Sequence, residues 1–307
     1  MATTAARRPS RSGFLTIRRR EALEGYLFAL PWIIGFSVFV AVPFVSSLAL
    51  SFTDYRIGGA IDFIGLANYQ AMFTSDDLFW VTLYNTFYYV VFAVSLGITT
   101  SLLMALLMNS RVKGIALFRT AVYVPSIVSG VALSFLWLFL LDPSLGLINY
   151  VLRVLGMTPP LWLQDEVWSK PGLILMQLST AGGSTMVVFL SGLQGVPQAL
   201  YEAAEIDGAS RFSRFRNVTI PMISPVVLFN VVVGIIGAFQ VFTQAYVMTN
   251  GGPGNSTLFY VLQLYNTAFY WGHMGYGSAL AWVLFVIILI FTLIQLKLAD
   301  RWVYYEH

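Results

Sequence analysis

Two long apolar segments enclose the polar stretch Tyr201-Glu202-Ala203-Ala204-Glu205-Ile206-Asp207-Gly208-Ala209-Ser210, which is followed closely by Val218-Thr219-Ile220-Pro221. Alanine favours a helix and Gly208 is able to end one, so the stretch predicts a short helix over residues 200–210. Glu202 and Glu205 are three residues apart and share a face of that helix. A short polar helix between two apolar segments suits docking onto another protein. An amphipathic helix at the membrane surface is the alternative, and Glu-Ala-Ala alone favours it.

Composition indicates a membrane protein. The chain has 307 residues, of which 58% are hydrophobic and 10% charged, whereas about 25% are charged in an ordinary soluble domain. The sequence contains no cysteine, which excludes disulfides, thiol catalysis and cysteine-ligated metals. His273 and His307 are too far apart to suggest a local metal site. We therefore predict a polytopic membrane protein without a metal centre.

Six hydrophobic segments are long enough to cross a bilayer, at about 20 residues each. They are residues 27–52, 80–108, 117–141, 172–193, 226–247 and 278–296. None contains Asp, Glu, Lys or His, and Arg119 stands at the edge of the third. The first apolar run, about 25 residues long, exceeds the 7–15 typical of a signal peptide, so it is read as a retained span.

The basic residues gather on one side of these spans. That side carries 14 of the 17 basic residues, namely Arg7, Arg8, Arg11, Arg18, Arg19, Arg20, Arg111, Lys113, Arg119, Arg211, Arg214, Arg216, Lys297 and Arg301. The other side carries Arg56, Arg153 and Lys170. By the positive-inside rule, both termini and the stretch around Glu202 are cytoplasmic. Membrane topology thus explains the basic excess, and no nucleic-acid partner is expected.

This topology divides the chain into three parts. Residues 1–25 form a cytoplasmic basic tail held near anionic membrane lipid. Residues 26–300 form a single six-helix membrane domain, which includes the polar segment 196–224. Residues 301–307 form a cytoplasmic C-terminus.

The full spacing of the polar stretch is more specific than Glu-Ala-Ala alone. Glu-Ala-Ala, three residues, glycine, nine residues and Val-x-Ile-Pro resembles the coupling motif of importer-type ATP-binding-cassette permeases. The resemblance implies that segment 196–224 docks onto a separate ATPase subunit. The residues expected to serve this contact are Glu202, Ala203, Ala204, Gly208 and Pro221. Val218 and Ile220 depart slightly from the family, which often has Ile and Leu there.

Residues 26–300 resemble the carbohydrate-importing, maltose-type branch of that family. The resemblance rests on stretches such as Phe63-Ile64-Gly65-Leu66-Ala67-Asn68-Tyr69, Gly146-Leu147-Ile148-Asn149 and Asn250-Gly251-Gly252-Pro253. It implies an all-α polytopic membrane protein with six transmembrane helices and a cytoplasmic coupling helix, the type I ABC importer fold. It also implies the cytoplasmic membrane of a prokaryote.

The same resemblance implies a complex. Its other members would be a second related permease subunit, usually different from the first, a dimer of ATP-binding subunits and an extracytoplasmic solute-binding protein. This chain has no Gly-Lys pair, so it lacks the phosphate-binding loop that needs one. It is therefore expected to be a non-catalytic pore subunit without a cofactor, with ATP and Mg on the partner ATPase.

A sugar site should combine amide or hydroxyl groups with aromatic rings. From Gln177 to Thr185 the fourth span is unusually rich in polar and small side chains. Gly182-Gly183 could loosen its helix. Gln240 and Gln244 are four residues apart and are predicted to share a face of the fifth span. The candidates for the substrate path are Gln177, Ser179, Thr180, Asn230, Gln240, Thr243, Gln244 and Trp137. Helix packing and interhelical hydrogen bonds would use the same side chains, so both interpretations stay open.

Other functions explain less of the sequence. A proton-coupled transporter normally uses ionisable residues inside its spans, and none is present beyond Arg119 at an edge. Sodium coupling would leave the coupling motif unexplained, and no acidic or histidine cluster supports a membrane enzyme. Import of another solute, such as glycerol phosphate derivatives, is the nearer alternative. An anionic solute would favour a basic residue in mid-span, so the sequence favours a neutral sugar or oligosaccharide as substrate.

Overall fold

The computed structural model describes residues 17–110 and 112–304, with side chains from residue 21 onward. The predicted basic tail therefore lies largely outside the described residues, as do Arg111 and His307. Within the described residues all regular structure is helical, apart from two isolated bridges, Thr53–Phe63 and Arg56–His273. The all-α prediction is confirmed.

The first of two compact units covers residues 1–50. It contains α1 (Ile17–Phe36), a π-helical turn (Ser37–Ala41) and most of α2 (Val42–Ser51). Helical structure continues through Pro31, which lies inside α1. Residues 21–51 are long and apolar enough to cross a membrane, in agreement with the first predicted span.

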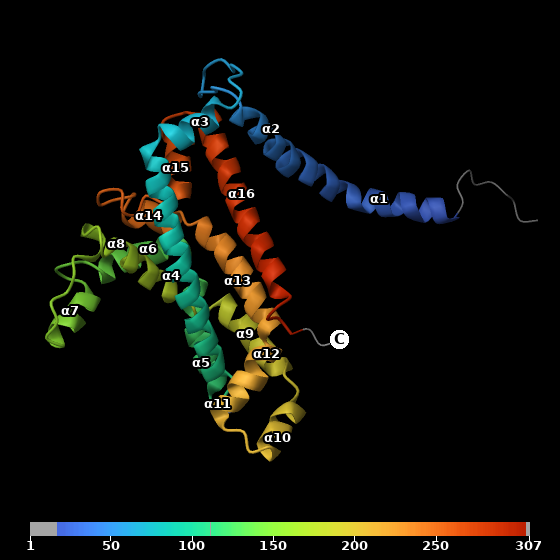
Figure 1. Cartoon of the computed structure of the whole chain (residues 1–307), viewed down its shortest axis with the longest axis vertical. Helices are drawn as coiled ribbons and strands as arrows, with labels where there is room; N and C mark the ends of the chain where they lie inside the picture. Colours follow the sequence, from blue (N-terminus) through green and yellow to red (C-terminus); the bar gives the residue numbers. More distant parts are fainter. Residues whose placement is uncertain (1–16, 111, 305–307) are drawn as a thin grey trace, which may run out of the picture. The chain divides into compact units, whose positions relative to one another are not determined.

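The second unit, residues 51–307, holds the other helices (Figure 1). They are α3 (Ala67–Thr74), α4 (Asp77–Met108), α5 (Ile115–Tyr123), α6 (Gly130–Leu140), α7 (Leu147–Val154), α8 (Ser169–Leu178), α9 (Ser184–Gly195), α10 (Gln198–Ile206), α11 (Arg211–Arg214), α12 (Ile220–Met222), α13 (Ser224–Phe239), α14 (Thr243–Met248), α15 (Tyr260–Tyr265) and α16 (Met274–Ala299). Helix α13 packs against α4, α9 and α16, and α14 packs against α6. In Figure 1, α3 lies at one end of this unit and α10 at the other.

Three long stretches of this unit can cross a membrane by length and composition, namely α4, residues 224–248 and α16. They correspond to the second, fifth and sixth predicted spans. The fifth is not one continuous helix, because α13 ends at Phe239 and α14 begins at Thr243. Phe242, with φ −140° and ψ −61°, interrupts the helical backbone between them.

The third predicted span, residues 117–141, is not a straight helix either. Helix α5 leads into a 3-10 turn at Val124–Ser126, and α6 then departs at an angle of 93°. Pro125 lies in that turn, and the Ser129 hydroxyl accepts a hydrogen bond from Ala132 N at 3.3 Å. A proline followed by an N-capping serine ends one helix and starts another, which accounts for the bend.

The fourth predicted span, residues 172–193, is broken as well. Helix α8 ends at Leu178, residues 179–183 form a turn, and α9 begins at Ser184. A Cβ atom on Gly182 would come within 2.5 Å of the Val122 carbonyl oxygen. The two glycines therefore interrupt the helix and also permit close packing on the corner between α5 and α6. The break agrees with the expectation that Gly182-Gly183 loosens the helix, and the short distances agree with close packing.

Candidate functional site: a polar cavity and an exposed coupling helix

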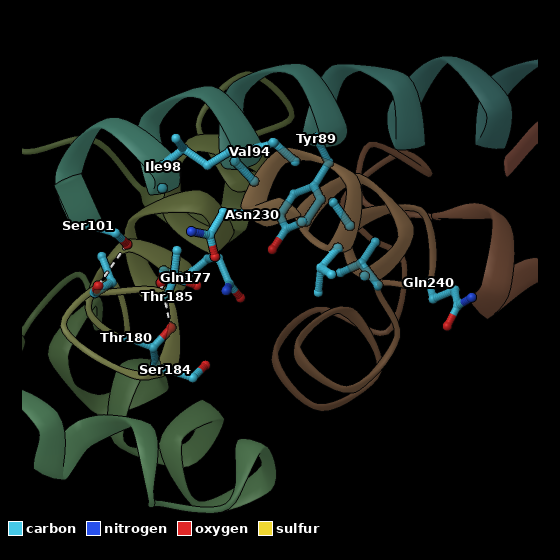
Figure 2. A pocket seen from close by; sticks show the side chains of 18 of the residues that line it. Tyr89, Val94, Ile98, Ser101, Gln177, Thr180, Ser184, Thr185, Asn230 and Gln240 are labelled. Atoms are coloured by element: carbon cyan, nitrogen blue, oxygen red, sulfur yellow. Dashed lines mark hydrogen bonds between the residues drawn. The ribbon is translucent and has the colours of Figure 1, made fainter. Parts of the chain in front are cut away.

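A cavity of about 520 Å³ opens among the middle of α4, the break between α8 and α9, and the break between α13 and α14 (Figure 2). Its lining includes six of the eight candidate path residues, namely Gln177, Thr180, Asn230, Gln240, Thr243 and Gln244. The structure thus brings together polar side chains from the fourth and fifth predicted spans. We call this space the central cavity.

The central cavity is uncharged. Among the described residues that line it, Tyr89 is the only one with an ionisable side chain, and the others are amides, hydroxyls, glycines and apolar residues. The surrounding polar groups therefore offer hydrogen bonds without a net charge. A neutral ligand with several hydroxyl groups is suited to such a lining.

The break between α8 and α9 forms one wall. Thr180 Oγ1 donates to Gln177 O at 2.8 Å within this turn (Figure 2). Ser101 Oγ, on α4, donates to Ala181 O at 2.7 Å and ties the turn to that helix. Side-chain hydroxyls thus satisfy carbonyl groups that a continuous helix would pair, as a membrane interior requires.

The opposite wall is the break between α13 and α14, and it corrects one prediction. Gln240 and Gln244 do not share a helical face, because α13 ends before Gln240. The Gln244 side chain donates from Nε2 to Tyr89 Oη at 2.7 Å, whereas Gln240 is exposed. In Figure 2 Gln240 stands apart from the group formed by Gln177, Thr180 and Asn230. The two amides therefore have different surroundings although both line the cavity.

Three of the path candidates are engaged in contacts within the chain. Asn230 is 6% exposed and donates from Nδ2 to Val226 O at 3.1 Å. Trp137 does not line the central cavity and packs in a buried cluster with Leu141 and Phe259. Ser179 lies outside the lining as well, and its hydroxyl donates to Met176 O at 2.6 Å.

The structure adds residues that the sequence reasoning missed. Tyr89 and Ser101 on α4 and Ser126 in the 3-10 turn line the central cavity. A signal was present, because polar residues recur at helical spacing along the buried side of α4, at Thr82, Asn85, Thr86, Tyr89 and Ser101. Such a polar stripe in an otherwise apolar span indicates an inward face.

A second polar region ties α4, α8 and the loop before α15 together. Lys170 Nζ donates to Asn85 Oδ1 at 3.0 Å and to Ser256 O at 3.1 Å. Burial lowers the pKa of Lys170, and the negative charge of Glu166 opposes that shift. Lys170 thus cross-links segments whose helices surround the central cavity.

The predicted docking helix is present as α10, ending at Ile206 rather than at Ser210. Its last turn closes through hydrogen bonds from Gly208 N to Glu205 O at 3.0 Å and from Ala209 N to Ala204 O at 2.9 Å. This pattern is the Schellman motif, which places a residue with positive φ directly after the helix. Gly208 has φ +74° and meets that requirement.

Two side-chain contacts hold α10 against the segment that leads into α13. Glu205 pairs with Arg214 across 3.4 Å, and Tyr201 Oη lies 3.0 Å from Thr219 Oγ1. The segment from α11 through the π-helical turn Phe215–Thr219 and α12 leads to α13. Helix α10 is therefore connected through these contacts to a helix that lines the central cavity.

The other coupling candidates lie on α10 itself or, for Pro221, in α12. Glu202 and Ala203 are exposed, Ala204 is half-buried, and Pro221 is half-buried in α12. Ile206 and Phe212 are 87% and 71% exposed, and sequence reasoning missed both. Large exposed apolar side chains beside an exposed carboxylate are typical of a protein-docking surface.

Known proteins share sequence with this chain. Residues 97–304 match the family model described as binding-protein-dependent transport system inner membrane component. The chain is 41% identical over 292 residues to the probable ABC transporter permease protein YesP of Bacillus subtilis, with 94% of each chain covered. It is 34% identical to the arabinooligosaccharides permease protein AraP of Bacillus subtilis, covering 94% of this chain and 92% of that one. It is also 34% identical to the trehalose/maltose permease protein MalF of Thermococcus litoralis, covering 92% and 95%.

Among solved structures, a chain of a bacterial ABC transporter that imports the acidic polysaccharide alginate superposes with a TM-score of 0.82. The match covers 92% of this chain and 96% of that chain, at 22% sequence identity. This likeness concerns the fold, which agrees with the predicted importer fold.

Proposed function

The chain belongs to the family of binding-protein-dependent transport system inner membrane components, and from that premise we propose that it is the pore subunit of an ATP-driven importer for neutral sugars or oligosaccharides. It is a multi-pass membrane protein. Relatives named for arabinooligosaccharides, trehalose/maltose and lactose support the sugar assignment.

The observation that carries this proposal is the uncharged lining of the central cavity. Amides such as Gln177, Asn230 and Gln240 offer donors and acceptors together, which is what a ring of hydroxyl groups needs. A phosphate or carboxylate solute would need a cationic partner to offset its desolvation. The described lining residues include no Lys, Arg or His, so the cavity suits a neutral substrate.

Energy would reach the cavity through α10. The exposed Glu202, Ala203 and Ile206 provide a surface for a separate ATPase subunit. The contacts of Glu205 and Tyr201 then carry its movement to the segment before α13. In this mechanism the chain hydrolyses nothing itself, and ATP with its Mg remains on the partner. A second permease subunit and an external solute-binding protein complete the complex.

The proposed orientation places α10 and both termini in the cytoplasm. We expect Ser210→Cys, at an exposed position, to react with a membrane-impermeant thiol reagent in opened membrane vesicles but not in intact cells. Because the native sequence has no cysteine, labelling reports that position alone. Asp62→Cys is the matched control, since it lies in the loop opposite α10 and should react in intact cells. Reaction of the Ser210 variant in intact cells would reverse the topology.

The transport assignment is tested by uptake into cells that express the chain with its partner subunits. We expect accumulation of at least one of labelled arabinotriose, maltose, trehalose and lactose, with no accumulation of labelled glycerol 3-phosphate. Uptake should disappear when ATP is depleted and persist when the sodium gradient is collapsed. Accumulation of glycerol 3-phosphate without any of the sugars would contradict the assignment of a neutral substrate.

A further inference from the structure

A second cavity lies at the end of the unit opposite α10, among the start of α4, the segment after α15 and the start of α16. Its volume is about 270 Å³. It is lined by Asp76, Leu78, Gln263, Thr267, Trp271, His273 and Tyr276. None of these residues belongs to the central cavity or to the docking surface of α10. We call it the α4–α16 cavity.

Two buried oxygen atoms in its lining lack a hydrogen-bond partner. Gln263 and Thr267 are each 3% exposed, and Gln263 Oε1 and Thr267 Oγ1 have no partner among the described residues. Leaving a buried polar atom unpaired costs about 1–3 kcal/mol. In the part of the chain that the structure describes, the other such atoms both belong to the side chain of Gln295. Gln263 and Thr267 both line the α4–α16 cavity, so a side-chain rotation toward it would let a hydrogen-bonding ligand supply the missing partners.

The rest of the lining is held in place. Asp76 Oδ1 accepts from Leu78 N at 3.0 Å and from Phe79 N at 3.3 Å, and Asp76 Oδ2 accepts from Tyr276 Oη at 2.6 Å. A carboxylate can accept about four hydrogen bonds, so capacity remains. The site is therefore built before any ligand arrives, and it is rich in acceptors.

The segment that carries Trp271 and His273 is fixed from the other side. Ile57 N donates to Gly272 O at 3.0 Å, and Gly275 N donates to Tyr55 O at 2.9 Å. Trp271 is 51% exposed, so the lining includes an aromatic ring accessible from outside. An accessible indole beside a carboxylate, an amide and a hydroxyl offers both an apolar face and hydrogen-bonding groups.

Gln263 Oε1 can only accept, so it needs a donor from the ligand, whereas the Thr267 hydroxyl can donate or accept. A calcium ion prefers about six to eight oxygen ligands, and here the single carboxylate is already shared among three donors. The volume exceeds that of one water molecule, about 30 Å³ in the liquid. Sugar hydroxyls supply donors, and a sugar ring has an apolar face for an indole. We propose that the α4–α16 cavity binds one ring of a neutral sugar, as a second site on the external end of the chain.

This inference rests on the proposed function, because it takes its ligand class and its external location from it. A sugar bound here would contact the chain before it reaches the central cavity. Occupation would also supply a donor for Gln263 Oε1 and a partner for the Thr267 hydroxyl.

The test uses the full-length chain in lipid nanodiscs, with His273→Cys as a single-cysteine reporter. At a concentration of maltose, lactose or arabinotriose about ten times the dissociation constant, labelling of this cysteine by a small thiol reagent should slow about tenfold. Tyr270→Cys, at a position that is 81% exposed and outside the lining, is the matched control and should label at an unchanged rate. In separate experiments, calcium chloride or sodium chloride replaces the sugar.

Gln263→Leu and Thr267→Val nearly conserve side-chain volume and remove the unpaired oxygens. Each is combined with the reporter substitution His273→Cys. Both should abolish protection by sugar and leave the thermal stability equal or higher, since an unpaired buried polar atom is replaced by an apolar group. Protection that persists in both variants would overturn the proposal. So would protection by a salt and not by sugar.

Uptake by the assembled transporter separates this inference from the proposed function. If the wild type transports one of these sugars and that sugar gives no protection at His273→Cys, the second site is wrong while the importer assignment stands. If the wild type transports none of them, both are wrong. Transport together with protection that is lost in Gln263→Leu and Thr267→Val supports both.

Discussion

Substitution of Gly208 by leucine is expected to abolish sugar-stimulated ATP hydrolysis and co-purification with the ATPase, whereas Gly208→Asn retains most of both. The backbone at this position has φ +74°, a conformation that asparagine tolerates better than other side chains. A Cβ atom at this position would meet no described atom outside the local chain within 4 Å, so the leucine side chain would project from the surface where the partner docks. The chain itself should still fold.

The loss of ATPase coupling expected in Gly208→Leu can be separated from the cost of backbone strain at this position. Left-handed backbone costs a non-glycine residue about 1–2 kcal/mol, and a thermal melt of the isolated chain measures that cost in both variants. Loss of coupling in the leucine variant beyond its loss of stability identifies a clash at the docking surface. Full coupling in Gly208→Leu would argue strongly against docking at α10.

Substitutions of Glu202 and Glu205 form a matched pair of variants that test the same docking surface. Glu202 has no ion-pair partner among the described residues, so Glu202→Gln removes a charge available only to the ATPase. A charge-assisted hydrogen bond contributes about 1.5–3 kcal/mol, so ATPase affinity should fall about 10- to 100-fold. Glu205 already pairs with Arg214, and this exposed contact is worth about 0–1 kcal/mol. Glu205→Gln should therefore change affinity little.

A further prediction concerns the central cavity. Gln240→Leu is expected to lower sugar uptake per assembled complex about 2- to 10-fold, the equivalent of one neutral hydrogen bond, without lowering the melting temperature. Gln244→Leu should instead lower the melting temperature, because it removes the hydrogen bond to Tyr89 Oη. Equal stability losses in both variants, with normal uptake per surviving complex, would assign the pair to packing.

Much of the fold was predictable because it depends on local composition. The apolar lengths of α4 and α16 and the helix that carries Glu202 follow from patterns within single segments. The break at Gly182-Gly183 was also visible as a possibility, since paired glycines weaken a helix. The 93° bend after α5 was missed, because a proline near a helix start also fits a continuous span.

The site was predictable only in part, for a different reason. Gln177 and Asn230 were found as polar residues within apolar spans. The separation of Gln240 from Gln244 was not, because it depends on where α13 ends. The α4–α16 cavity joins Asp76 to Gln263 and Tyr276, which are far apart in sequence. Neither hydropathy nor spacing along the chain carries information about such long-range contacts.

The interrupted backbone around the central cavity also limits what can surround the chain in a bilayer. Gln177 and Gln240 are exposed amides at its rim, and hydrocarbon tails offer them neither donors nor acceptors. Annular lipid is therefore excluded from this flank, which must be wetted by water or covered by protein. A single copy surrounded by lipid alone would leave these amides unsolvated, so the second permease subunit proposed above would favour stable insertion as well as transport.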